Sequence, residues 1–86
     1  MNKPTLPVTT ALRQVIKQVC PQIENLRAYS DERFPQPGVK AVGVKILFRN
    51  FSEDEITLII HLMKHRGYTF HYQRPNNWGP RFCFSI

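Results

Sequence analysis

The fold is decided by residues 51–72, which read FSEDEITLIIHLMKHRGYTFHY. Ser52 is followed three residues later by Glu55, the spacing of a capping box, in which each side chain binds a backbone N–H of the other residue. Gly67 is suited to the left-handed position that ends many helices. We therefore predict a helix from about Glu53 to Arg66.

One side of this predicted helix is apolar and the opposite side carries two histidines. His61 and His65 are four residues apart, so they share one face of the helix, and we expect that face to meet solvent. The sequence offers no His-Glu-x-x-His motif and no obvious third ligand. We predict no metal site and no cofactor. The predicted buried side is formed by Ile56, Ile59, Ile60 and Met63.

Aromatic residues alternate with polar ones in the two segments that follow, which indicates a hairpin of two strands. The connecting loop reads PNNWGP. In one register of the two strands, both sets of aromatic residues face the core. A shift of the pairing by one residue would turn one set to the opposite face, so we predict the first register. The predicted cross-strand pairs are Phe70 with Phe84, His71 with Cys83, Tyr72 with Phe82, and Gln73 with Arg81.

A strand is also predicted upstream of the helix, over residues 41–49. Val42, Val44, Ile46 and Phe48 alternate there with the remaining residues, which is typical of a strand with one buried face. If this strand runs parallel to the first hairpin strand, the connection through the helix is expected to be right-handed.

The N-terminal part predicts a further helix that begins near Thr9 or Thr10. Pro21 interrupts its apolar stripe, so the helix either kinks there or ends, with a second short helix starting at Pro21. The stripe stays in phase across Pro21, which favours the kink. Residues 1–8 are expected to be flexible and residues 30–38 to form a linker or turn. The stripe consists of Leu12, Val15, Ile16, Val19, Ile23 and Leu26.

These elements predict one α+β domain over residues 1–86, in the order helix, strand, helix, strand, strand, with a three-stranded sheet packed on the helices. A winged helix-turn-helix is the alternative. It is less favoured because a long strand separates the two predicted helices, whereas that fold places consecutive helices before its hairpin.

The charge of the chain is uneven along its length. The 86 residues include 12 Lys and Arg against 6 Asp and Glu, a formal net charge of +6. Residues 56–86 contain no acid but include Lys64, Arg66, Arg74 and Arg81. This excess favours an anionic partner, and nucleic acid is the commonest one for a small basic domain. The alternative is that the charge only keeps the protein in solution.

The candidate site is the sheet face opposite the aromatic core, together with the hairpin loop. Guanidinium groups bind phosphates, amides contact base edges, and an exposed indole stacks on a base. In the alternative reading the first helix covers this face and Trp78 folds onto the core. The predicted nucleic-acid-binding residues are Lys45, Arg49, His71, Gln73, Arg74, Asn76, Asn77, Trp78 and Arg81.

Two other functions compete with nucleic-acid binding. The first is a protein-binding inhibitor or adaptor that docks on a larger protein, possibly one that processes nucleic acid, with Trp78 as an anchor. A homodimer through an open sheet edge belongs to this class. The second is a small metal-independent ribonuclease with His71 as acid or base, but the strand offers His71 no acidic partner. We therefore favour a binding protein over an enzyme.

The cysteines and the apolar segments suggest where the protein acts. Cys20 and Cys83 lie far apart and form no Cys-x-x-Cys motif. No apolar run is long enough for a secretory signal or a membrane span. We expect a cytoplasmic protein without a membrane partner.

Overall fold

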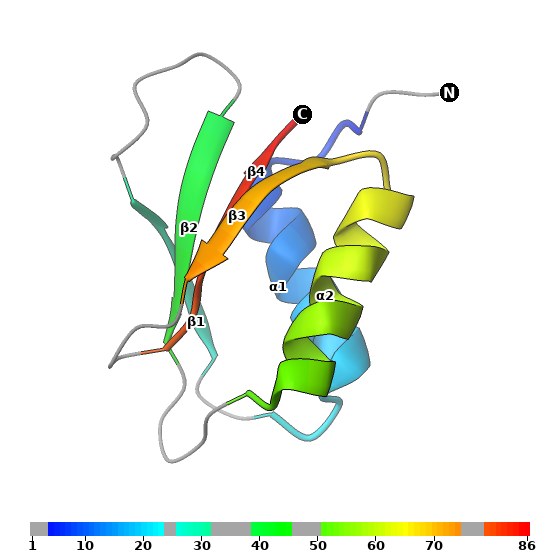
Figure 1. Ribbon diagram of the computed structural model, residues 1–86, viewed down its shortest axis with the longest axis vertical. Helices are drawn as coiled ribbons and strands as arrows, with labels where there is room; N and C mark the ends of the chain where they lie inside the picture. The colour runs from blue at the N-terminus through cyan, green and yellow to red at the C-terminus, as the bar shows by residue number, and fades with distance from the viewer. Residues whose placement is uncertain (1–3, 24–25, 32–38, 46–50, 75–78) are drawn as a thin grey trace.

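Four strands form one antiparallel sheet, and two helices pack against one of its faces (Figure 1). The computed structural model describes residues 4–23, 26–31, 39–45, 51–74 and 79–86. No helix among these residues covers the other face, which we call the helix-free face. The elements are α1 (Val8–Val19), β1 (Arg27–Asp31), β2 (Val39–Lys45), α2 (Glu53–His65), β3 (Thr69–Arg74) and β4 (Arg81–Ser85), and the strand order is β1-β2-β4-β3.

The α+β class is confirmed, but the sheet has four strands where three were predicted. The additional strand, β1, includes residues 30 and 31, which were expected to begin a linker. Its register places the small residues Ala28 and Ser30 on the helix side, so β1 shows no apolar alternation in the sequence. β2 spans residues 39–45. The rest of the predicted strand, residues 46–49, and the rest of the predicted linker, residues 32–38, lie outside the described residues.

The strand order also changes the expected connection through α2. β2 and β3 both pair antiparallel with β4, which lies between them. They therefore run parallel to each other without being neighbours. The four-stranded sheet with a single helix between β2 and β3 does not correspond to a winged helix-turn-helix.

The first helix begins earlier than the sequence suggested. It starts at Val8, and the preceding Pro7 provides no side-chain cap, so the predicted caps Thr9 and Thr10 lie in the first turn instead. The Tyr68 hydroxyl donates a hydrogen bond of 2.6 Å to the Leu6 carbonyl. The end of the segment expected to be flexible is thus tied to Tyr68, three residues beyond α2.

The helix stops before Pro21, so the predicted kink is wrong. α1 ends at Val19, and the Cys20 N–H donates to the Ile16 carbonyl at 2.8 Å. Cys20 has φ −127° and ψ 77°, outside the helical region, which a following proline disfavours. Ile23 belongs to a turn rather than a second helix, and it still packs against the core.

The prediction of α2 is confirmed at both ends. Ser52 Oγ accepts a hydrogen bond from the Glu55 N–H at 3.1 Å, and Glu55 Oε1 accepts one from the Ser52 N–H at 2.9 Å. Gly67 has φ 99°. The N–H groups of Gly67 and Tyr68 donate to the carbonyls of Lys64 and Met63, which is the Schellman ending of a helix.

The core lies between the helices and the sheet. Phe84 is central to it: its ring lies 5.5 Å from that of Phe70 and 6.2 Å from that of Phe82, measured between centroids. Within the part of the chain that the structure describes, no helix is long and apolar enough to cross a membrane. The fully buried apolar residues of this core include Leu12, Val15, Ile16, Val42, Val44, Ile59, Met63, Phe82 and Phe84.

Candidate nucleic-acid interface

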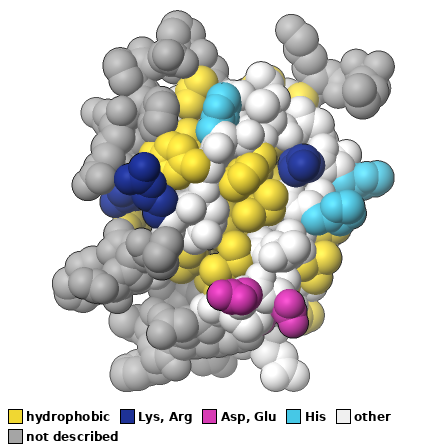
Figure 2. Space-filling view, in the orientation of Figure 1, with side chains coloured by type: hydrophobic (Ala, Val, Ile, Leu, Met, Phe, Trp, Pro, Cys, Tyr) yellow, Lys and Arg dark blue, Asp and Glu magenta, His cyan; other side chains and the backbone are white. Residues whose placement is uncertain are grey.

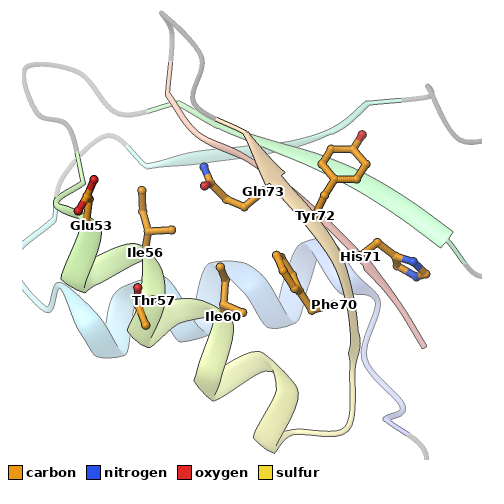
Figure 3. Close-up of a pocket in the computed structure, with 8 residues that line it drawn as sticks. All are labelled: Glu53, Ile56, Thr57, Ile60, Phe70, His71, Tyr72 and Gln73. Carbon is orange, nitrogen blue, oxygen red and sulfur yellow. The ribbon is translucent and has the colours of Figure 1, made fainter.

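An extra residue in β3 decides which side chains reach the helix-free face. Phe70 pairs with Phe84, as predicted, but the register then shifts and His71 is left over. Such a bulge reverses the alternation of side chains beyond it. Figure 3 shows Phe70 and Gln73 pointing toward α2, and His71 and Tyr72 pointing away from it. The observed pairs beyond the bulge are Tyr72 with Cys83, Gln73 with Phe82, and Arg74 with Arg81, so the other three predicted pairs are wrong.

Gln73, a predicted contact on the helix-free face, therefore lies on the helix side. It lines a groove of about 580 Å³ between α2 and β3, together with Ile56, Ile60 and Phe70 (Figure 3). Its Nε2 atom is buried and has no hydrogen-bond partner among the described residues. Gln73 cannot serve the face for which it was predicted.

Tyr72 takes a place on the helix-free face instead, next to two arginines. The Arg74 guanidinium carbon lies 5.2 Å from the centroid of the Tyr72 ring, a cation–π arrangement. Arg74 lies directly opposite Arg81 in the register. Two like charges in directly opposite positions destabilise a sheet.

Tyr29 is a second aromatic residue on this face, and the sequence analysis missed it. It lies directly opposite Gly43, and a Cβ built on Gly43 would overlap with the end of the Tyr29 ring. The ring therefore covers the Gly43 backbone, while Tyr29 remains 42% exposed. Only the pairing of β1 with β2 brings these residues together, and no local sequence pattern signals it.

Basic residues from all four strands gather at one end of the helix-free face. Tyr29, Gly43, Arg81 and Arg74 form a continuous row across the sheet, one residue from each strand. Arg27 lies two residues before Tyr29 and pairs with the backbone of Lys45. We call Arg27, Arg74, Arg81 and the Lys45 position the basic end. Arg27 is a member that the sequence analysis did not identify.

His71 lies on the same side of β3 as Arg74, three residues before it. It is exposed, and its Nε2 atom lies 2.9 Å from Ser85 Oγ. A hydroxyl is not the carboxylate that would orient a catalytic base. Arg49, Asn76, Asn77 and Trp78 lie outside the described residues.

The alternative in which α1 covers this face is wrong. Leu12 and Ile16 of α1 belong to the same core as Ile59 and Met63 of α2, so both helices occupy one side. At the centre of the helix-free face Ala41 and Cys83 are paired, and both side chains are fully buried by the atoms around them.

Burial raises the pKa of the Cys83 thiol above its ordinary value. The thiol stays protonated at neutral pH, where a nucleophile would need the thiolate.

His61 and His65 are exposed on α2, as expected. Among the residues described, no group of three or more His, Cys, Asp or Glu side chains could hold a metal ion.

Comparisons of the chain with protein-family models, with curated proteins and with solved structures found no match.

Proposed function

We propose that the protein binds nucleic acid through the helix-free face, with phosphates held at its basic end. The observation that carries this proposal is the direct opposition of Arg74 and Arg81 beside the Tyr72 ring. Guanidinium groups bind phosphate through two parallel hydrogen bonds, so two arginines placed side by side on one face give a phosphate several donors.

Three of the six acidic residues lie in the helix layer, away from the basic end. Glu53, Asp54 and Glu55 occupy the first turn of α2, in the helix layer. Figure 2 shows acidic side chains at the start of α2, and Lys or Arg side chains at the end of β3. A polyanion would be repelled from the first region and attracted to the second.

The experiment is a fluorescence-anisotropy titration of labelled oligonucleotides over a series of salt concentrations. We expect binding at ~50 mM salt that weakens steeply as salt rises, because each phosphate contact releases counterions. Arg74→Ala and Arg81→Ala should each lower the slope of log K against log salt by about 1. Lys17→Ala is the matched control, since Lys17 is exposed on α1 in the other layer and should leave the slope unchanged. Absence of binding at ~50 mM salt would refute the proposal.

A protein partner is the second candidate, and the groove between α2 and β3 favours it. The groove has apolar walls formed by Ile56, Ile60 and Phe70, and it runs beside β3, an edge strand of the sheet. An extended segment of another protein can add to such an edge. A pull-down from cell lysate with and without nuclease separates the two candidates. A protein that is retained after nuclease treatment would support docking in the groove, whereas loss of the retained material on nuclease treatment would support nucleic-acid binding at the basic end.

A further inference from the structure

Tyr29 differs from an ordinary exposed tyrosine because the end of its ring packs against the backbone of the neighbouring strand. The end of the ring covers the Gly43 backbone, which has no side chain to push it away. Gly43 is buried, whereas Tyr29 is 42% exposed. The ring is therefore packed at one end against the sheet backbone and still meets solvent.

Three arginines lie on the same face as this ring, and their backbones are separated from it by distances that a nucleotide could span. Neighbouring strands lie about 4.8 Å apart, so the backbone of Arg81 is one spacing beyond Gly43 and that of Arg74 is about 10 Å beyond it. Arg27 lies about 7 Å along β1 on the same face. A base placed on the Tyr29 ring would have its own phosphates within reach of these side chains.

The shape of the face argues against a duplex. Four strands span about 14 Å between the outer backbones, whereas the major groove is about 12 Å wide and admits a helix or a two-stranded ribbon. In a duplex the faces of the bases are already stacked on one another. A single strand exposes them, and stacking on an aromatic side chain tolerates any base.

We propose that the ligand is a single strand of DNA or RNA, with a base stacked on Tyr29 and its phosphates on Arg81 and Arg74. This inference rests on the proposed function and goes beyond it by naming the strandedness of the ligand and the stacking residue. Tyr72, under the Arg74 guanidinium, provides a second planar group on the same face.

The test compares Tyr29→Leu and Tyr29→Phe on single-stranded and duplex oligonucleotides of equal length at ~50 mM salt. The leucine variant should weaken single-strand binding by about 10-fold. It should leave duplex binding within about 2-fold, because phosphate contacts do not use the ring. The phenylalanine variant retains the ring and should bind like the original protein. Leu58→Ala is the matched control, since Leu58 is 45% exposed on α2 in the other layer.

A second measurement does not depend on how the variants fold. Ultraviolet crosslinking of the unaltered protein to a single strand that contains a photoreactive uracil should attach the strand to the peptide that contains Tyr29. Crosslinks confined to other peptides, or an equal loss of single-strand and duplex binding in Tyr29→Leu, would overturn the inference and leave the arginine contacts standing. Failure of both ligands to bind the unaltered protein would instead overturn the proposed function.

Discussion

Gln73 of β3 lies directly opposite Phe82 of β4, the residue whose side chain fills the core between sheet and helices. Paired residues of an antiparallel sheet share a face, so a polar amide is turned toward the apolar groove beside α2. Strict alternation from Phe70 would have placed Gln73 on the helix-free face. The extra residue His71 accounts for the difference.

Gln73→Met is expected to stabilise the protein by about 1 kcal/mol, because it removes a buried amide that lacks a hydrogen-bond partner. The free energy of unfolding from urea titration measures this effect. Oligonucleotide binding by the variant should be unchanged. A loss of binding with no change in stability would mean that Gln73 faces the nucleic acid and that the bulge is wrongly placed.

Ser52→Ala should lower the free energy of unfolding by about 1 kcal/mol, because the Glu55 N–H loses its acceptor at the start of α2. Thr57→Ala, at an exposed position in the same helix, is the control and should cost nothing, since alanine favours helix. Equal losses in the two variants would contradict a specific contribution from the cap.

Gly43→Ala should destabilise the protein by about 1 to 3 kcal/mol, because the added methyl group overlaps with the Tyr29 ring. The penalty should largely disappear when Tyr29→Ala is already present. A double-mutant cycle of unfolding free energies measures this coupling. Additive effects of the two substitutions would show that the ring does not cover Gly43.

The stability of the protein should fall as the pH rises above about 9, where thiols ordinarily lose their proton. Burial raises the pKa of Cys83 in the folded state above its ordinary value of 9.0, so the folded chain keeps a proton that the unfolded chain releases. Urea titrations at about pH 8 and about pH 9.5 should therefore show a smaller decrease for Cys83→Ala than for the original protein. An identical decrease in both would show that Cys83 ionises equally in the two states.

The sequence was informative wherever a structure depends on neighbouring residues. The two ends of α2 are fixed by local hydrogen bonds, between Ser52 and Glu55, three residues apart, and between Tyr68 and Met63, five residues apart. The pairing of Phe70 with Phe84 was also predictable, because only one register places both aromatic rings in the core.

The sequence was uninformative where the outcome depends on distant pairing. β1 has small residues on its helix side, so it becomes a strand only by pairing with β2. The bulge at His71 cannot be recognised from the alternation of aromatic and polar residues along β3. Arg81 was predicted on the helix-free face and lies there, whereas Arg74 was predicted only as part of the hairpin loop and reaches this face through the bulge. Tyr29 and Arg27 were missed.

The central position of β4 has a consequence for the chain during its synthesis. Residues 81–85 come after every other described strand, yet they join β2 to β3 and contribute Phe82 and Phe84, the largest fully buried side chains. Until these residues leave the ribosome, β2 and β3 have no strand between them to pair with. The helices also lack the two phenylalanine side chains against which they pack. Unpaired strand edges are prone to aggregate, so we expect these strands to form the sheet only after residues 81–85 have been released.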